Sequence, residues 1–289
     1  MLKFAMKDTS LYLKLSRHSW LEKFITFRMD ALVETQDAKL ASELYKRHRV
    51  SGGTTKETAP GRFQDLDEAT LKILGAGPHA VHDVAVSSGI TSMELYELLT
   101  AHGISFKLWV SDKFSKYFQK GTWIRRIYDA DKKLLHAYCL GILADWKVSW
   151  KYPFTKFLFL LLSKTDSPGG RVSEIPLYDP SLLKMLRSGA IAEMQFDLFA
   201  TELPPQFTFV RCMNVLNLNY FPEDRILAAL RLLNLSMREG GVLLVGRTGD
   251  GGFNTATFFL KTGDGNLESI LDLRGGSEIK SLVRKLSRD

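Results

Sequence analysis

The feature that most constrains this 289-residue chain is the stretch Ala80–Ser92, which has the pattern of a strand, a tight turn and the start of a helix. An apolar run interrupted only by His82 and Asp83 predicts a buried strand, and Ser92–Thr100 predicts a helix. Between them, small residues occupy every second position: Ala85, Ser87 and Gly89. Such a turn brings backbone N–H groups and a helix N-terminus close to a ligand, so the stretch indicates an α/β fold with a binding site here.

This turn lacks the Gly-x-Gly-x-x-Gly pattern of dinucleotide enzymes. It resembles the first motif of class I S-adenosylmethionine-dependent methyltransferases, acidic-x-Gly-x-Gly-x-Gly, with alanine and serine in place of two glycines. The resemblance implies that S-adenosyl-L-methionine is the cofactor. It also implies the residues that bind it: Asp83, Ala85, Ser87, Ser88 and Gly89. From the residues alone, a tight strand-to-helix turn with a purely structural role remains the alternative.

A second carboxylate follows the next predicted strand. The alternating pattern of Ile104–Ser111 ends at Asp112, which lies 23 residues after Gly89. In doubly wound folds an acidic residue about 20 residues past the turn accepts hydrogen bonds from the ribose hydroxyls. Asp112 is therefore predicted to bind the cofactor ribose, and the alternative is that it caps the following helix.

A third strand is predicted over Ala190–Leu198, ending in Phe-Asp-Leu. This ending resembles the methyltransferase element that recognises adenine. The resemblance implies that Asp197 accepts a hydrogen bond from the exocyclic amine and that Leu198 packs on the ring. The alternative for Asp197 is an ordinary loop residue near a strand end.

The segment from Phe207 to Arg247 combines a strand, an Asn-Val-Leu turn, Tyr220-Phe221, an amphipathic helix and a Gly-Gly pair before another strand. It is similar to the catalytic domain of chemotaxis-receptor methyltransferases. It departs from them in Met213 and in two additional residues before Tyr220. The resemblance implies that Asn214 lies near the methionine end of the cofactor, where it also counts as a catalytic candidate. Tyr220 is the candidate that orients or deprotonates the nucleophile.

The predicted fold is α/β, with a doubly wound and mostly parallel sheet that ends in a C-terminal antiparallel hairpin over residues 255–273. Residues 1–75 are predicted to form an N-terminal helical segment, with helix over 10–50 and again after Asp65. Residues 76–289 form the Rossmann-like domain, interrupted by an inserted α+β subdomain at about 120–185. The insertion begins with a predicted hairpin over 123–143, and we expect it to shape substrate choice.

Residues 146–164 carry an apolar run flanked by Trp, Tyr and Lys. The run is shorter than the roughly 20 residues that span a bilayer. Two interpretations remain, a buried roof over the active site and an in-plane membrane anchor. We favour the roof, since six apolar residues offer little area for an anchor.

Composition excludes several classes. The formal net charge of +7 is moderate, and no Lys/Arg block with interleaved aromatic residues indicates nucleic-acid binding. Cys139 and Cys212 lie far apart in apolar runs, which predicts reduced thiols and a cytoplasmic protein. No Cys/His cluster has the spacing of a metal site, and His82 is interpreted as a core histidine.

Three functions therefore compete. The first is an S-adenosylmethionine-dependent methyltransferase acting on an unidentified small-molecule, lipid or protein acceptor. The second is a non-catalytic binding module that retains the methyltransferase fold, suggested by Ala85 and Ser87. The third is a nicotinamide-dependent oxidoreductase, which the missing glycine fingerprint disfavours. The methyl acceptor and the oligomeric state are not encoded in any motif.

Overall fold

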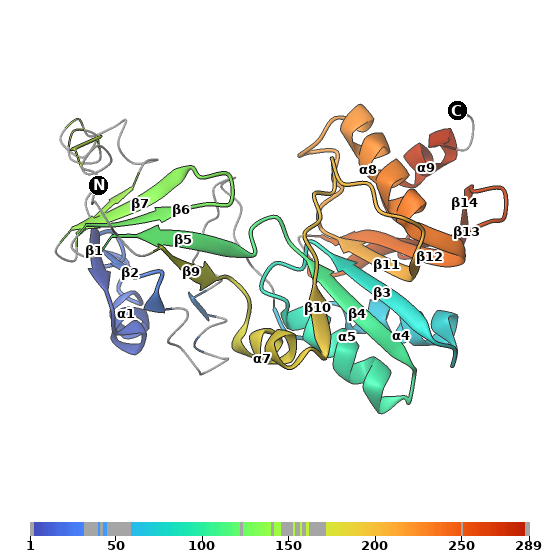
Figure 1. Ribbon diagram of the computed structural model, residues 1–289, viewed down its shortest axis with the longest axis horizontal. Coiled ribbons are helices and arrows are strands. Elements are labelled where there is room, and N and C mark those ends of the chain that lie inside the picture. Colours follow the sequence, from blue (N-terminus) through green and yellow to red (C-terminus); the bar gives the residue numbers. More distant parts are fainter. Residues whose placement is uncertain are drawn as a thin grey trace. The chain divides into compact units, whose positions relative to one another are not determined.

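The computed structural model describes residues 3–31, 40, 43–44, 59–121, 124–139, 142–145, 153, 157, 160–161, 172–249 and 251–286. The chain divides into two compact units. The first comprises residues 1–58 and 114–180, and the second comprises residues 59–113 and 181–289. Each unit is built around its own sheet and core (Figure 1).

The second unit contains a seven-stranded mixed sheet. Its first five strands in spatial order are parallel, and the last two are antiparallel to their neighbours. The predicted doubly wound sheet with a C-terminal hairpin is thereby confirmed. In spatial order the strands are β10 (Ile191–Glu193), β4 (Phe106–Ser111), β3 (His79–Val84), β11 (Phe207–Met213), β12 (Met237–Thr248), β13 (Asn254–Lys261) and β14 (Leu267–Leu273).

Helices cover both faces of this sheet (Figure 1). The helices α4 (Gln64–Leu74) and α5 (Ile90–Ala101) lie on one face, and α8 (Glu223–Ser236) and α9 (Lys280–Leu286) lie on the other. The short helix α7 (Pro180–Ser188) precedes β10. Apolar residues three and four positions apart on α8 give it a buried stripe: Ile226, Leu230 and Leu233.

The first unit contains α1 (Thr9–Leu15) and a second seven-stranded sheet. All neighbouring strands in it are antiparallel except β2 and β1. The hairpin expected over 123–143 is confirmed as β6 and β7. In spatial order the strands are β2 (Ile25–Phe27), β1 (Lys3–Met6), β8 (Ile142–Asp145), β7 (Leu134–Cys139), β6 (Ile124–Tyr128), β5 (Lys116–Lys120) and β9 (Val172–Pro176).

The N-terminal segment differs from the helical prediction. Helix α1 lies within it, but residues 25–27 form β2, and β1 precedes both. These strands have three and four residues, which is too short for an alternating pattern to identify them. They form because β8, contributed by the inserted segment, pairs with β1. Most of residues 32–58 lie outside the described residues.

The division into units also differs from the predicted boundaries. The chain start and the insertion belong to one unit, and residues 59–75, with α4, belong to the Rossmann-like unit. The reason is long-range strand pairing, which joins β1 to β8 across more than a hundred residues.

Of the segment 146–164, the structure describes only Pro153, Phe157, Leu160 and Leu161, and the remainder lies outside the described residues. The side chains of Phe157, Leu160 and Leu161 are exposed. The interpretation of this segment as a roof over an active site stays a prediction. No helix among the described residues combines the length and the apolar character needed to cross a membrane.

A buried arginine joins four elements of the Rossmann-like unit. Arg211 on β11 is fully buried and pairs in register with Asp83 on β3. Its Nε and Nη2 donate to the two Asp83 carboxylate oxygens at 2.9 and 2.6 Å, and its Nη1 donates to Asp67 Oδ1 on α4 at 2.7 Å. From α5, the carbonyl oxygen of Thr91 accepts from Nη2 at 2.9 Å, and the Ser92 hydroxyl donates to Asp83 at 2.6 Å. We call these five residues the Arg211 cluster.

Two carboxylates share one guanidinium in this cluster, so the cluster has a net negative charge when all three groups are ionised. Burial raises the pKa of Asp67 to about 6; Arg211 opposes this shift, whereas the nearby Asp83 carboxylate reinforces it. Burial by itself would lower the pKa of Arg211, but Asp83 and Asp67 outweigh that effect and raise it. The arginine therefore stays charged, and Asp67 is the member that takes up a proton.

Replacing Arg211 by methionine should destabilise the fold by about 3–5 kcal/mol, because it leaves two buried carboxylates without their cationic partner. Arg238→Met is the matched control, since Arg238 is exposed on β12, and it should change stability by no more than about 0.5 kcal/mol. Urea unfolding of both variants measures the difference. Equal effects would show that the cluster adds nothing beyond an ordinary surface arginine.

The raised pKa of Asp67 predicts how the free energy of unfolding changes with pH. The folded protein favours the protonated carboxyl, so this contribution to stability is complete below about pH 4 and is lost as pH rises through about 6. The shift from 3.8 corresponds to roughly 3 kcal/mol. The free energy of unfolding of the wild type, relative to Asp67→Asn, should therefore fall by about that amount between pH 4 and pH 7. A constant difference across this range would contradict the assignment.

Candidate functional site

The candidate site lies where the parallel strands of the second sheet end. In the sheet, β4 and then β10 lie on one side of β3, and β11 and then β12 lie on its other side. The junction of β3 and β11 is thus the point at which strand order reverses, where ligands bind in doubly wound sheets. The register pairs Val84 with both Ser111 and Cys212, so Asp112, Ala85 and Met213 follow at one edge.

The loop after β3 holds three residues in the left-handed region. Ala85 and Ser87 each have a φ of 58°, and Gly89 has a φ of 80°. These are the three positions at which the methyltransferase motif has glycine. The backbone therefore adopts the conformation of a glycine loop even though two of its residues carry Cβ atoms, at a cost of roughly 1–2 kcal/mol each. Strain of this kind persists only where the surroundings impose it, and it concentrates at functional sites.

Gly89 is required by space as well as by φ. A Cβ atom added there would overlap the side chain of Leu182, which is fully buried on α7. Helix α7 thus packs directly against the glycine that precedes α5. This contact is one of the constraints that hold the loop in its strained form.

Asp112 lies beside this loop, at the end of β4. Its Oδ2 accepts a hydrogen bond of 2.7 Å from the backbone N–H of Ser87. The loop is also tied to β4 by the Val86 N–H, which donates to the Ser111 carbonyl at 3.1 Å. The structure therefore brings Asp112 together with the predicted binding loop, as the spacing suggested.

Ser88 holds an unsatisfied hydroxyl. The residue is fully buried, and its Oγ has no hydrogen-bond partner among the residues that the structure describes. A buried polar atom without a partner costs about 1–3 kcal/mol and calls for an explanation. An explanation that fits the other features of this turn is a polar ligand group that binds at the loop and pairs with the Ser88 hydroxyl.

Asp83 has a different position from the other predicted loop residues. It is buried, and both of its carboxylate oxygens are engaged by Arg211, with Ser92 also donating to Oδ2. In the structure it anchors the loop to β11 and to the first turn of α5. Its contacts are those of a positioning residue.

Asp197 and Leu198 follow β10. The Asp197 carboxylate accepts from the Phe199 N–H at 2.9 Å, and its own N–H donates to the Thr201 hydroxyl at 2.9 Å. One oxygen of Asp197 thus stabilises the local turn, which is the role expected of an ordinary loop residue near a strand end. Leu198 is buried in the core beneath α8, in the same cluster as Val84.

Asn214 begins the loop after β11 with a φ of 62°. Its N–H donates to the Gly246 carbonyl at 2.9 Å, and its side-chain oxygen accepts from the Thr248 N–H at 2.7 Å. Tyr220 lies farther along this loop with 62% of its surface exposed. Asn214 is therefore held against β12, whereas Tyr220 is turned to solvent. His82 is fully buried between Phe196 and Phe207, in agreement with a core role.

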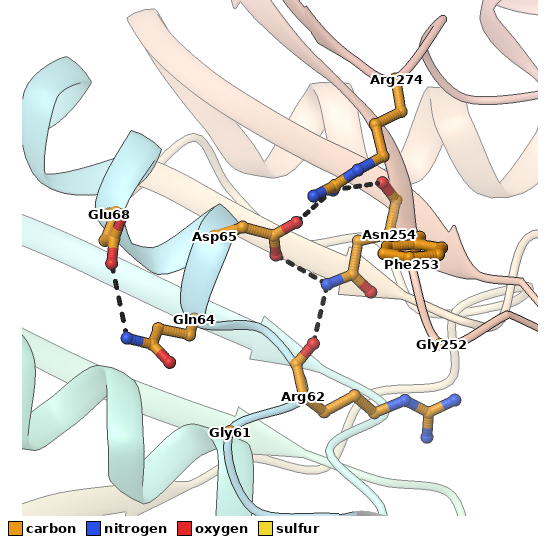
Figure 2. Close-up of a pocket in the computed structure, with 9 residues that line it drawn as sticks. All are labelled: Gly61, Arg62, Gln64, Asp65, Glu68, Gly252, Phe253, Asn254 and Arg274. Atoms are coloured by element: carbon orange, nitrogen blue, oxygen red, sulfur yellow. Dashed lines mark hydrogen bonds and ion pairs between the residues drawn. The ribbon is translucent and has the colours of Figure 1, made fainter.

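The structure reveals a cavity that the sequence did not indicate. It has a volume of about 280 Å³ and lies between the start of α4 and the turn from β12 to β13 (Figure 2). The Asn254 amide donates at 2.7 Å to Asp65 and to the Arg62 carbonyl, and Arg274 pairs with Asp65 (Figure 2). The lining residues come from three distant segments and match no motif: Gly61, Arg62, Gln64, Asp65, Glu68, Gly252, Phe253, Asn254 and Arg274.

This cavity is connected to Asn214 through Thr248. The Thr248 N–H donates to the side chain of Asn214, and its hydroxyl donates at 2.8 Å to Asn254 Oδ1. The Arg62 Nε also donates to this hydroxyl, at 3.0 Å. The end of β12 therefore links the predicted methionine end of the cofactor site to the cavity wall.

Comparison with known proteins returns structural matches alone. Neither the protein-family models nor the curated proteins yield a match. A protein of Pyrococcus horikoshii is 11% identical, with 79% of each chain covered and a TM-score of 0.37. An S-adenosylmethionine-dependent methyltransferase from Clostridium acetobutylicum is 12% identical, with 78% of this chain and 80% of that chain covered and a TM-score of 0.36.

A third match is a coclaurine N-methyltransferase bound to N-methylheliamine and SAH. It is 7% identical and has a TM-score of 0.33, and the match covers 64% of this chain and 35% of that one. At these TM-scores the similarity is partial. The assignment of the fold rests instead on the strand order of the sheet.

The strained loop makes a testable prediction. Ala85→Gly removes the left-handed strain, which should outweigh the added flexibility of glycine in the unfolded chain, and should stabilise the protein by about 0.5–1 kcal/mol. Ala228→Gly, inside α8, is the matched control and should destabilise by about 1 kcal/mol. Thermal unfolding gives the sign of each change. Destabilisation by Ala85→Gly would rule out a strained loop at this position.

Proposed function

We propose that this protein is an S-adenosylmethionine-dependent methyltransferase. The observation that supports this most directly is the loop after β3, in which Ala85, Ser87 and Gly89 all have positive φ at the three glycine positions of the methyltransferase motif. Its place at the reversal of strand order, beside the Asp112 carboxylate, adds to the argument. The acceptor is a small molecule, a lipid or a protein side chain.

The residues of the loop fit the cofactor. The turn leaves one buried hydroxyl, that of Ser88, without a partner among the described residues, and Asp112 is an acceptor-only group suited to ribose hydroxyls. In this proposal Ala85, Ser87, Ser88 and Gly89 approach the cofactor through the loop backbone, and Asp112 binds the ribose. Asp197 and Leu198 contact the adenine, and Asp83 acts by holding the loop to Arg211.

When bound, the cofactor supplies a sulfonium methyl group for direct in-line displacement. The protein's main task in such a reaction is to position the two reactants. We assign Asn214, which β12 holds in place through Thr248, to the methionine end. Tyr220, exposed on the loop after β11, is assigned to orienting or deprotonating the acceptor.

A binding module without turnover would share this cofactor site. It differs from the methyltransferase in one observable respect, because it would bind S-adenosylmethionine without releasing S-adenosylhomocysteine in the presence of any acceptor. A nicotinamide-dependent oxidoreductase would instead bind NAD. Calorimetry with S-adenosylmethionine, S-adenosylhomocysteine and NAD therefore separates the third function from the first two.

S-Adenosylhomocysteine should bind the purified protein and raise its melting temperature, because a ligand of the native state stabilises it by mass action. Isothermal titration calorimetry and thermal unfolding measure both effects, with NAD as the control ligand. A shift with NAD and none with millimolar S-adenosylhomocysteine would eliminate the proposal.

Asp112→Asn should weaken S-adenosylhomocysteine binding by about 1.5–3 kcal/mol, because it removes a charged acceptor from the ribose. The amide oxygen can still accept from the Ser87 N–H, so the melting temperature without ligand should change little. Asp224→Ala, which alters an exposed residue in the first turn of α8, is the control and should leave affinity unchanged. Unchanged affinity in Asp112→Asn would confine Asp112 to holding the loop.

A further inference from the structure

The two units differ sharply in charge. Residues 1–58 and 114–180 contain 22 Lys and Arg against 13 Asp and Glu, a net charge of +9. The Rossmann-like unit contains 17 against 19, a net charge of −2. The whole excess of positive charge in the chain therefore belongs to the unit that does not carry the candidate cofactor site.

The same unit exposes a group of large apolar side chains at its N-terminal edge. The exposed fractions are 64% for Trp20, 53% for Phe24, 57% for Phe4 and 39% for Ile142. We call these four residues the N-terminal apolar patch. Apolar side chains as large as these are usually buried, and an exposed group of them marks an interaction site.

Backbone hydrogen bonds and strand pairing join the segments that carry the four residues. Residues 18–24 form hydrogen-bonded turns that lead into β2, in which the Glu22 N–H donates to the His18 carbonyl and the Ile25 N–H donates to the Leu21 carbonyl. Trp20 and Phe24 both lie in these turns.

The other two members join at the sheet. The Phe4 N–H donates to the Phe24 carbonyl at 2.7 Å. Phe4 on β1 is also directly opposite Ile142 on β8 in an antiparallel pair, so both side chains lie on one face. The patch therefore draws on three adjoining segments, the turn, β1 and β8.

Cations accompany the patch. Residues 3–28 contain six Lys and Arg against two Asp and Glu, a net charge of +4. Lys14, Arg17 and Lys23 in this segment are exposed. Aromatic side chains beside exposed Lys and Arg are the composition by which proteins bind the interface of an anionic bilayer, with the rings in the headgroup region and the cations on the phosphates.

We propose that the N-terminal apolar patch docks this unit on an anionic lipid surface. The partner is a bilayer because the patch joins an aliphatic side chain to its aromatic ones and has a net positive surround. A nucleic-acid groove would require cations that track a phosphate backbone. The proposal does not depend on the methyltransferase assignment, since it concerns the other unit.

The test is co-sedimentation of the full chain with vesicles of phosphatidylglycerol and phosphatidylcholine, compared with phosphatidylcholine alone. Binding should favour the anionic vesicles and fall between 0.05 and 0.5 M salt, over which the Debye length shrinks several-fold, from above about 10 Å to below it. The double variant Trp20→Ser/Phe24→Ser should weaken binding at least about tenfold. Its melting temperature should not change, because both side chains are exposed.

Phe253→Ser is the matched control, since Phe253 is as exposed as Trp20 but lies in the Rossmann-like unit. It should bind vesicles like the wild type. Phe157→Asp tests the segment 146–164. If that variant lost vesicle binding while the double variant kept it, the proposal would be overturned. Binding to single-stranded nucleic acid but not to vesicles would overturn it as well. So would a wild-type dimer that the double variant converts to a monomer without any vesicle binding.

Discussion

The Rossmann-like unit depends on one buried interaction, the contact of Arg211 with Asp83 and Asp67. The guanidinium is fully buried and joins β11 to β3, to α4 and to the first turn of α5. A charge in this position is tolerated only with partners on every side. Five donors in a planar fork can meet several acceptors at once, which a lysine could not do in the same geometry. The cluster thereby fixes where β3 ends and where α5 begins.

The strained loop lies between these two fixed ends. Asp83 and Ser92 anchor it on either side, α7 packs against Gly89, and Asp112 receives the Ser87 N–H. Such constraints explain how Ala85 and Ser87 keep a conformation that usually needs glycine. They also account for two replaced glycines in a loop of unchanged shape, since the surroundings impose the backbone path that glycine would otherwise permit.

The two units divide the physical properties of the chain. The Rossmann-like unit holds the strand-order reversal, the loop and the cavity beside Asn254. The other unit holds the net positive charge and the N-terminal apolar patch. An overall charge of +7 conceals this division, because it is the sum of a basic unit and a slightly acidic one.

The sequence by itself determined the elements whose patterns are local. The strand, turn and helix around Gly89, the hairpins and α8 were all predicted, because alternation, small-residue spacing and helical periodicity depend on near neighbours. Asp112 was located by its distance from Gly89 along the chain. Only the tertiary structure decided what depends on distant partners. The strand β1 pairs with β8 and carries β2 on its other side. The Asp83 carboxylate is bound by Arg211, and the Asn254 cavity is assembled from three separate segments. A buried ion pair and a strand as short as β1 leave no periodic trace in the sequence, since each is stabilised by residues more than a hundred positions away.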